Sequence, residues 1–489
     1  MAQPPVSVPA YGAGIAMSIK TLHLTNYWHA RSGGIATFYR QLIETANRLQ
    51  RCAILVVPGE RDEVEESGAY CRIYKIAAPH SPLNRDYRTI YPREFLLPES
   101  KLQHILAAER PDLVEICDKY SLVHLGPLLR LQLMRRLNLR PVVVGLTCER
   151  MDENFDAYVT RSWWGRSFSR LYMRHVYFPA FDHHIAVSEN TAAELRAVAN
   201  GHIVPRGTWI RPMGVDVASF SPSKRSPEVR RRLLGSDESD GSTLLLLYVG
   251  RLAPEKNLGL LLAMLAELEK AGQSFRLVFA GDGIARESLR RDAHTRFAGK
   301  VVFLGHIADR DELARLYASC DFFVHPNPTE PFGIAPLEAM ASELPVVAPN
   351  RGGITSYANE SCAYLADPAP EAFALAILAA RRDSTVTARR VKAARAVAEA
   401  LAWSKVTEGY LDLYDALYRI GTGHQPMEAA SPTFVSSVPA AGRAARLHLA
   451  SRFAQTIFSA YVQSHRVASL LNPCSRSQHQ TELKGAQSQ

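Results

Sequence analysis

The sequence predicts an α/β protein built from two doubly wound domains, each with a parallel sheet covered by helices. Short apolar runs rich in β-branched residues alternate with helix-length segments from about residue 19 to residue 400. This alternation is typical of repeated strand–helix–strand units around a parallel sheet. It is interrupted once, by the polar, arginine-rich stretch SPSKRSPEVRRRLLGSDESDGS at residues 221–242. The chain therefore divides into two Rossmann-like halves of similar size, and we expect a cleft between them.

Each expected strand is a nearly continuous hydrophobic run, as in sheets that are buried on both faces. In the first half these runs are KTLHLT (20–25), AILVVP (53–58), RIYKIA (72–77), DLVEIC (112–117), PVVVGL (141–146) and HHIAVS (183–188). In the second half they are TLLLLYVG (243–250), FRLVFAG (275–281), VVFLG (301–305), DFFVHP (321–326) and PVVAP (345–349). Amphipathic segments such as IATFYRQLIETANRLQ and LGLLLAMLAELEKAG lie between the runs and predict the covering helices.

The same pattern sets the expected domain limits. We expect a disordered extension at residues 1–18, a first domain at 19–220, a second domain at 221–400, a closing helix at 401–420 and a tail of low order at 421–489. The tail is rich in Ala, Ser and Gln, a composition that favours disorder. It contains one basic amphipathic segment, ARLHLASRFAQTIFSAYVQ, at residues 445–463.

The composition is that of a globular protein in a reducing compartment. Hydrophobic residues make up 47% and charged residues 21% of the chain. The formal net charge of +9 permits an anionic partner such as a nucleotide or a lipid headgroup, and it does not require nucleic acid. The seven cysteines are scattered without a C-x-x-C pair or a Cys/His cluster, which argues against a disulfide framework and a structural zinc site. Because we find neither a signal-peptide pattern nor an apolar run near the ~20 residues of a membrane span, we expect a cytoplasmic protein.

The segment HPNPTEPFGIAPLEAMASELPVVAPNRGGITSY, residues 325–357, predicts an anion site at the start of a helix. It begins at the end of an expected strand, and Pro336 suits the first turn of a helix. The backbone N–H groups around Phe332, Gly333 and Ile334 would then point outward with the positive end of the helix dipole behind them. Such an arrangement binds phosphates.

Two glutamates lie on either side of this expected helix start. Glu330 precedes it, and Glu338 lies within its first turns. If a diphosphate rests on the helix N-terminus, one carboxylate can accept hydrogen bonds from a sugar and the other from a ribose. The spacing therefore predicts a sugar-nucleotide site. The alternative is a pair of glutamates that only complements the helix dipole.

Two further loops follow expected strands, at the edge where open α/β sheets bind ligands. Arg251 and Lys256 lie in the loop after residues 243–250, and these side chains can bind phosphate as a two-donor fork and a point charge. The alternative for these two cations is a solvated surface. The turn AGDG at Gly281, Asp282 and Gly283 would let the backbone approach a ligand closely.

These motifs together resemble a known enzyme family. The matching segments are GVD, VGRLAPEKN, AGDG, FLGHI, TEPFGIAPLEAMA and PVVAPNRGG. The chain resembles the retaining family 4 glycosyltransferases (group 1 glycosyl transferases) of the GT-B fold over about residues 19–420. The resemblance implies that Arg251 and Lys256 bind the donor diphosphate. It also implies that Glu330 contacts hydroxyls of the donor sugar and that Glu338 contacts the ribose.

By the same resemblance, donor binding extends to the backbone of residues 332–334, the turn at Gly281 and Asp282, and His306 near the base. During transfer the anomeric carbon becomes oxocarbenium-like while negative charge builds on the departing diphosphate. The two cations and the helix N-terminus would stabilise that charge, so we expect no metal ion and no cofactor beyond the sugar nucleotide. The triplet at residues 309–311, DRD, resembles a metal-binding D-x-D, but we interpret it as a helix N-cap.

The first half would hold the acceptor side. Gly33 and Gly34 open a helix, and the resemblance places such a glycine loop opposite the donor phosphates. Cys148 aligns with a histidine that usually touches the donor sugar, so its role in this chain is a departure from the family. Two further departures are Glu343, where a glycine commonly ends the helix, and Ser356, where a glutamate is common.

The resemblance implies a retaining transfer of a hexose from a GDP- or UDP-linked sugar to a lipid-linked or polysaccharide acceptor. A covalent carboxylate intermediate and front-face attack within an ion pair both stay open. Two alternatives to this function are a catalytically inactive sugar-nucleotide-binding scaffold subunit, suggested by Cys148, and an epimerase of the same fold.

The segment RSWWGRSFSRLYMRHVYF, residues 161–178, raises the question of membrane contact at the inner face of the membrane. Arginines recur every four residues at Arg166, Arg170 and Arg174, with aromatic and apolar residues between them. A basic amphipathic helix can lie on an anionic membrane surface. The alternative is a helix that packs on the sheet and presents a solvated arginine face. The same two interpretations apply to the tail segment.

Overall fold

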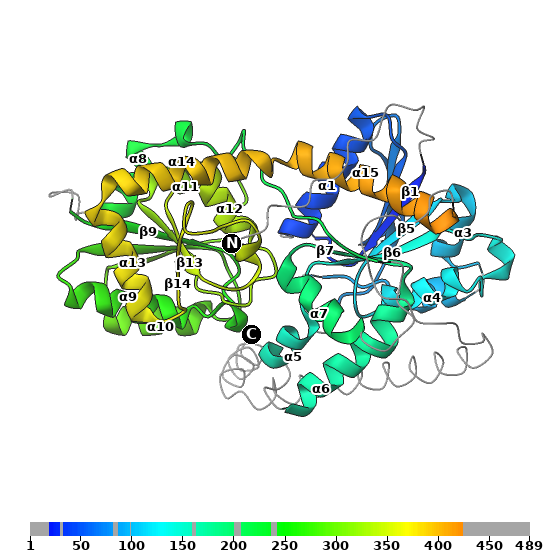
Figure 1. Cartoon of the computed structure of the whole chain (residues 1–489), viewed down its shortest axis with the longest axis horizontal. Helices are drawn as coiled ribbons and strands as arrows, with labels where there is room; N and C mark the ends of the chain where they lie inside the picture. Colours follow the sequence, from blue (N-terminus) through cyan, green and yellow to red (C-terminus); the bar gives the residue numbers. More distant parts are fainter. Residues whose placement is uncertain are drawn as a thin grey trace, which may run out of the picture.

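The computed structural model describes residues 19–29, 33–81, 87–97, 99–158, 163–199, 207–235 and 242–423. In this part of the chain two sheets stand side by side, and helices cover both faces of each sheet (Figure 1). The predicted α/β class with two parallel-sheet domains is confirmed. The predicted extension at residues 1–18 and the amphipathic segment of the tail lie outside the described residues.

The first sheet has the strand order β3-β4-β2-β1-β5-β6-β7-β8. Its strands are β1 (Thr21–Thr25), β2 (Ala53–Gly59), β3 (Glu63–Glu66), β4 (Cys71–Ala77), β5 (Leu113–Cys117), β6 (Val142–Thr147), β7 (His183–Ala186) and β8 (Thr208–Ile210). All pairings are parallel except that of β3 with β4. The associated helices are α1 (Gly34–Arg48), α2 (Arg93–Leu96), α3 (Lys101–Glu109), α4 (Leu125–Arg130), α5 (Met151–Tyr158), α6 (Trp163–Tyr172) and α7 (Glu189–Ala199).

The second sheet is parallel throughout and has the order β11-β10-β9-β12-β13-β14. Its strands are β9 (Leu244–Val249), β10 (Phe275–Ala280), β11 (Val301–Gly305), β12 (Phe322–Val324), β13 (Val346–Pro349) and β14 (Tyr364–Ala366). The helices that follow β8 are α8 (Pro227–Leu234), α9 (Gly259–Lys270), α10 (Arg286–Arg296), α11 (Arg310–Ser319), α12 (Ile334–Ala341), α13 (Pro370–Arg382), α14 (Ser384–Ala400) and α15 (Trp403–Thr422). The exact domain limits stay a prediction.

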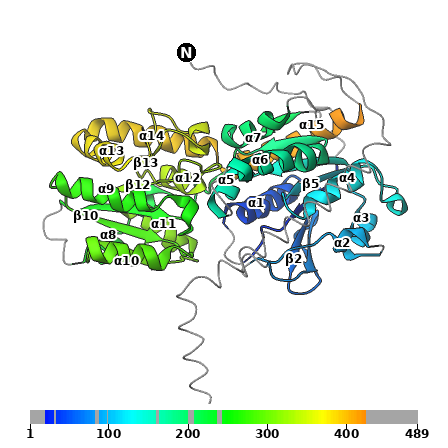
Figure 2. The ribbon, with the colours of Figure 1, turned by 90° about the horizontal axis from the view of Figure 1, so that it is seen from below.

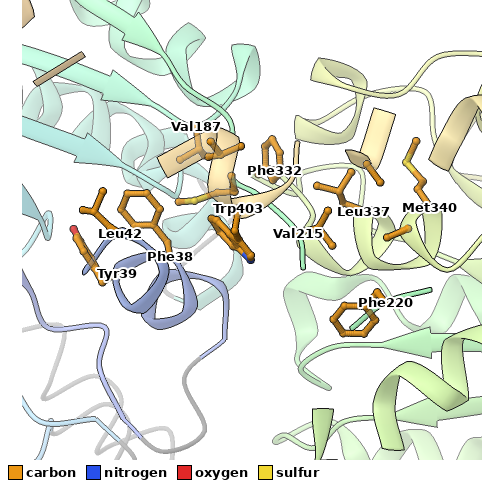
Figure 3. Close-up of a cluster of buried hydrophobic side chains, with 14 of the residues drawn as sticks. Phe38, Tyr39, Leu42, Val187, Val215, Phe220, Phe332, Leu337, Met340 and Trp403 are labelled. Carbon is orange, nitrogen blue, oxygen red and sulfur yellow. The ribbon is translucent and has the colours of Figure 1, made fainter. Parts of the chain in front are cut away.

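Helix α15 leaves the second domain and packs on α1 and β6 of the first (Figure 1). Its aromatic residues join the core there: the rings of Phe38 and Tyr410 lie 4.8 Å apart, and Trp403 packs on the same phenylalanine. Figure 3 shows this contact beside Phe332 and Leu337 of the second domain. One buried hydrophobic cluster therefore continues from one domain into the other.

A buried carboxylate also anchors α15. Glu115 on β5 accepts hydrogen bonds from the hydroxyls of Tyr39 and Tyr414, and its Oε1 lies 3.2 Å from Nδ1 of His23. All four side chains are buried. Because buried polar groups are stable only when they are hydrogen-bonded, this cluster specifies where α15 docks on the first domain.

Two of the expected departures have structural explanations. Glu343, at the end of α12, adopts a φ of 54°, which is the left-handed conformation that favours glycine. The hydroxyl of Ser356 accepts a hydrogen bond of 3.2 Å from the backbone N–H of Glu189 at the start of α7. The neighbouring Ser188 hydroxyl donates to the carbonyl of Pro331. The Ser356 contact joins the first domain to the turn Gly353–Ser356, and the Ser188 contact joins it to the loop before α12.

Candidate active site

The predicted donor loops meet at the carboxyl edge of the second sheet. Lys256 lies in the loop after β9, and Glu330 lies in the loop after β12, the strand that pairs with β9. The Nζ atom of Lys256 is 2.8 Å from Oε2 of Glu330. Two residues 74 positions apart in the sequence are thus brought into direct contact, where open sheets bind ligands.

Glu330 is held in its charged form by the groups around one of its oxygens. Asn327 donates a hydrogen bond of 3.0 Å to Oε2, the oxygen that Lys256 contacts, and Nε2 of His325 lies 3.7 Å from it. Burial raises the pKa of Glu330, but the charge of Lys256 and smaller contributions from His325 and Asn327 lower the pKa to about 2. Because these groups gather on Oε2, the other carboxylate oxygen, Oε1, is left for a ligand.

Glu338 lies one turn into α12 and has a different environment. The hydroxyl of Tyr317 donates a hydrogen bond of 3.0 Å to its Oε2. Burial raises the pKa of Glu338 to about 7, although the charge of Arg310 opposes the rise. The two glutamates of the predicted pair therefore differ in charge at neutral pH: Glu330 is fully ionised and Glu338 is near its midpoint.

The raised pKa of Glu338 predicts a pH-dependent effect on stability. As pH rises from about 4.5 to about 7, the unfolded chain releases the Glu338 proton more readily than the folded chain, so folded stability falls. We expect Glu338→Gln to be more stable than the native protein at pH 8 and about equally stable at pH 4. Urea unfolding at both pH values measures this difference. A stability difference that is the same at both pH values would contradict the assigned pKa.

Helix α12 begins at Ile334, two residues before the predicted position at Pro336, with Gly333 as N-cap at a φ of 92°. The backbone N–H groups of the predicted anion site therefore belong to the N-terminus and first turn of this helix. The Phe332 side chain is buried against Tyr357, with ring centroids 4.9 Å apart, so only its backbone is placed to meet a ligand. A Cβ on Gly353 would lie 2.0 Å from the Pro331 carbonyl oxygen, which shows how tightly the RGG segment supports this loop.

The loop that carries Arg251 and Lys256 packs its backbone against the backbone of the AGDG turn. A Cβ on Gly281 would lie 1.9 Å from the carbonyl oxygen of Gly250, and the φ of Gly281 is 149°. The N–H of Gly281 also donates to the carbonyl of Gly305, directly before the exposed His306. Asp282 is exposed, and its carboxylate caps the N–H of Gly283. The predicted turn thus lies between the loop of Arg251 on one side and the segment of His306 on the other.

The two predicted cations differ in exposure. Arg251 is 52% exposed and lies 3.0 Å from Glu255 in the same loop. Lys256 is only 18% exposed and contacts Glu330. The carboxylate of Glu255 is only 15% exposed, so an incoming diphosphate would share Arg251 with Glu255, because leaving a buried carboxylate without its cation is costly. Lys256 has three donors and can contact a phosphate while it keeps Glu330.

The glycine loop of the first domain faces this site. A Cβ on Gly34, the first residue of α1, would lie 2.3 Å from Cδ1 of Ile334, the first residue of α12. The N-termini of α1 and α12 therefore lie against each other across the domain boundary. Gly33 precedes α1 as its N-cap. Figure 2 shows α1 and α12 on the sides of the two domains that face each other.

Cys148 lies directly after β6 and is half-buried. Its Sγ is 3.8 Å from Sγ of Cys117, at the end of the neighbouring strand β5. The adjacent Arg150 is directed away from it, to Asp152 at 2.6 Å and Glu153 at 3.0 Å. The surroundings of Cys148 indicate a space-filling thiol.

We therefore expect Cys148→Ser and Cys148→Ala to keep most of the catalytic activity, with losses of at most about tenfold, or roughly 1.4 kcal/mol in barrier. The reason is that the adjacent Arg150, which could activate the thiol, is paired with Asp152 and Glu153 instead. Turnover rates of both variants measure the effect. Abolished transfer in a variant that still folds and binds nucleotide would mean that the thiol is chemically required.

Four site residues could not be predicted individually. His325, Asn327 and Tyr317 gather around the two glutamates, and the first two lie inside the segment that predicted the site. Glu153, in the first turn of α5, has a pKa that burial raises to about 8, with a smaller contribution from the charge of Glu330 across the boundary. The sequence carried no signal for Glu153, because nothing in its neighbourhood places it opposite Glu330.

The predicted helix cap at residues 309–311 is confirmed. Asp309 is the N-cap of α11, and its side chain accepts a hydrogen bond from the N–H of Asp311. Asp311 in turn pairs with Lys224 at 2.6 Å and with Arg315 at 2.7 Å. Among the residues that the structure describes, no group of three or more His, Cys, Asp or Glu side chains could hold a metal ion.

Helix α6 places Arg166 and Arg170 in solvent, together with Leu171, which is 52% exposed. Tyr172 at the end of the helix is buried. The side chains of the two tryptophans that begin α6 lie outside the described residues. No helix within the described ranges is long and apolar enough to cross a bilayer.

Comparisons with known proteins agree with this geometry. Residues 230–397 match the family described as Glycosyl transferases group 1, and residues 32–219 match Glycosyltransferase Family 4. The chain is 27% identical over 406 residues to a GDP-mannose-dependent alpha-(1-6)-phosphatidylinositol dimannoside mannosyltransferase of Mycobacterium tuberculosis, a match that covers 82% of this chain and 97% of that protein.

Among solved structures, sucrose-phosphate synthase from Thermosynechococcus elongatus has a TM-score of 0.61 at 20% identity, with 82% of this chain and all of that chain covered. The Anabaena protein HepE, solved in complex with UDP and glucose, has a TM-score of 0.57 at 18% identity, with 81% of this chain and 99% of that chain covered. At these identities the two structures establish the fold alone.

Proposed function

Because the chain belongs to the group 1 glycosyltransferases of the GT-B fold, we propose that it moves a hexose from a nucleoside-diphosphate sugar to a lipid-linked or polysaccharide acceptor. One observation carries this proposal. Glu330 is held ionised by Lys256, with Oε1 left for a ligand, beside the N-terminus of α12. A nucleoside-diphosphate sugar needs both a carboxylate that accepts hydrogen bonds from its sugar hydroxyls and a nearby site for its phosphates.

In the proposed complex the diphosphate rests on the first turn of α12, with Arg251 and Lys256 against its oxygens. Glu330 accepts hydrogen bonds from the donor sugar, and Glu338 accepts them from the ribose. As the bond between sugar and phosphate breaks, the cations and the helix dipole stabilise the charge on the leaving diphosphate. The fixed carboxylate of Glu330 stabilises the oxocarbenium-like sugar. We infer that the anomeric configuration is retained and that no divalent metal takes part.

The identity of the sugar-nucleotide donor is proposed from the proteins that this chain resembles. The mycobacterial protein is GDP-mannose-dependent, and HepE was solved with UDP. Because the mycobacterial relative matches over most of both chains, GDP-mannose is the first donor to test and UDP-glucose the second. The same relative acts on a phosphatidylinositol dimannoside, which supports a lipid-linked acceptor.

The test is a donor panel that includes GDP-mannose, UDP-glucose and their relatives, assayed in the presence of EDTA with a phosphatidylinositol mannoside acceptor. We expect release of one nucleoside diphosphate and a product with the anomeric configuration of the donor, as determined by NMR. An inverted product would overturn the retaining assignment. Activity that EDTA abolishes and manganese or magnesium restores would overturn the metal-free mechanism. No transfer from any donor would favour the scaffold alternative.

We further propose that the exposed face of α6 contacts the anionic inner surface of the membrane. Two exposed arginines and the exposed Leu171 are on this helix, and such a combination binds anionic surfaces. We expect the double variant Arg166→Glu with Arg170→Glu to sediment less with phosphatidylglycerol vesicles than the native chain. The matched control is Arg290→Glu with Arg291→Glu on α10, where the arginines are also exposed. Equal loss in both double variants would mean that α6 has no special role.

A further inference from the structure

His325 ends the strand run of β12 and lies directly behind Glu330. Its backbone N–H donates a hydrogen bond of 2.9 Å to the carbonyl of Val347, so the residue is fixed by the sheet. Its imidazole is buried, at 4% exposed, and burial lowers the pKa of His325 to about 4. The ring is therefore neutral at physiological pH, and one of its two nitrogens carries a hydrogen.

The inner nitrogen of this ring has no hydrogen-bond partner among the described residues. Nε2 is buried from solvent, and 3.7 Å separate it from Oε2 of Glu330, which is too far for a hydrogen bond. Buried polar atoms without a partner are uncommon, and each one calls for an explanation. The charged groups that act on the ring are Glu330 and Lys256. A small movement would bring Oε2 of Glu330, now 3.7 Å away, within hydrogen-bond distance of Nε2.

Three groups converge on one oxygen of Glu330. Lys256 is 2.8 Å and Asn327 is 3.0 Å from Oε2, and His325 is next in distance. In the proposed complex Lys256 contacts the donor diphosphate as well as Glu330, so its contact with Oε2 is shared between two anions and weakened. Oε2 then has room to approach Nε2 and accept a hydrogen bond from it. The imidazole replaces part of the contact that the lysine gives up.

We propose that His325 is a positioning residue that donates from Nε2 to Oε2 of Glu330 in the donor-bound state and so keeps Oε1 directed at the donor sugar. This inference rests on the proposed function, because it assumes a donor beside Glu330. A neutral donor suits this place, since it orients the carboxylate without adding a second positive charge to compete with the oxocarbenium-like sugar. The competing interpretation is a histidine that only fills space beneath the loop.

The experiment compares His325→Gln with His325→Leu. The amide nitrogen of glutamine can occupy the place of Nε2, whereas leucine keeps the bulk and removes the donor. We measure kcat and donor KM with GDP-mannose or the donor that the panel identifies, the affinity for the free nucleoside diphosphate by calorimetry, and the melting temperature. We expect His325→Leu to lower kcat about tenfold with a nucleoside diphosphate affinity within about twofold of native, and His325→Gln to recover most of the loss.

Equal kcat losses in the two variants, unchanged kcat in His325→Leu, or loss of nucleoside diphosphate affinity would each overturn the proposal. If His325→Leu does not fold, His325→Asn replaces it, because the shorter amide cannot reach the position of Nε2. A double-variant cycle gives a second reading: in the Glu330→Gln background, the His325 substitution should have no further effect on kcat, and an additive effect would overturn the proposal. Turnover by the native protein tests the proposed function separately, and its absence would overturn both.

Discussion

Glu330→Gln should slow turnover by about a hundredfold or more and leave the affinity for the free nucleoside diphosphate nearly unchanged. The native carboxylate is ionised down to a pH of about 2, because Lys256 outweighs the effect of burial. Glutamine keeps the size of the side chain but carries no charge to stabilise a cationic sugar. The amide also replaces one of the two carboxylate oxygens with an NH2 donor, whereas Lys256 and Asn327 both donate to this carboxylate. Steady-state kinetics and calorimetry with the nucleoside diphosphate measure the two effects separately.

The matched control is Glu338→Ala, which removes the other carboxylate of the pair. Glu338 lies further along α12 and contacts Tyr317 rather than Lys256, and the proposed complex places it at the ribose. We expect this variant to lose nucleoside diphosphate affinity. If Glu330→Gln weakens nucleotide binding while Glu338→Ala affects only turnover, the ligand lies along the helix in the reverse direction.

The central strands of both sheets could be predicted from the sequence because burial on both faces leaves a continuous apolar run. All eleven predicted runs form strands. The three strands that sequence reasoning missed are β3, β8 and β14, and each lies at an edge of its sheet. β3 has the sequence EVEE and is exposed along its length, so it shows no hydrophobic pattern. β8 and β14 have three residues each, too few to show a period.

The candidate site could be predicted as far as its residues lie in one segment. The order of loop, helix start and two glutamates is local, so the sequence from residue 325 to residue 357 defines it. Contacts between segments could not be predicted. Nothing local indicates that Lys256 meets Glu330, that Gly34 meets Ile334, or that Ser356 caps the start of α7. These contacts depend on strand order and on the relative position of the two domains.

The partnership of Lys256 and Glu330 leads to the second large effect. We expect Lys256→Met to reduce turnover at neutral pH by about a thousandfold and to weaken nucleoside diphosphate binding at least tenfold. Methionine has a similar length and no charge. The variant loses a phosphate ligand, and it leaves the carboxylate of Glu330 in a buried site without the ion pair at 2.8 Å. Removing one partner of a buried pair is costly for this reason.

The pH profile distinguishes this cause from simple loss of a contact. In the native protein, the pKa of Glu330 is lower in the folded chain than in the unfolded chain. Ionised Glu330 therefore contributes to folded stability above the unfolded-chain pKa near 4.5, and this contribution is lost as pH falls through about 2. Without Lys256 the effect of burial dominates and the pKa of Glu330 rises. The residual activity of Lys256→Met should therefore increase with pH above the range in which the native Glu330 titrates, in addition to any change that Glu338 causes in both proteins.

The control for this prediction is the same substitution at another lysine–glutamate pair. Lys270 lies 2.7 Å from Glu267 on α9, a distance like that of Lys256 from Glu330, but Lys270 is 71% exposed. Because solvent screens exposed pairs, Lys270→Met should leave turnover, nucleotide affinity and pH profile unchanged. Native-like nucleotide affinity and an unshifted pH profile in Lys256→Met would show that the lysine neither binds the diphosphate nor keeps Glu330 ionised. The geometry predicts the opposite, because the Lys256 ammonium contacts Glu330 at 2.8 Å and the proposed complex also places it against the diphosphate.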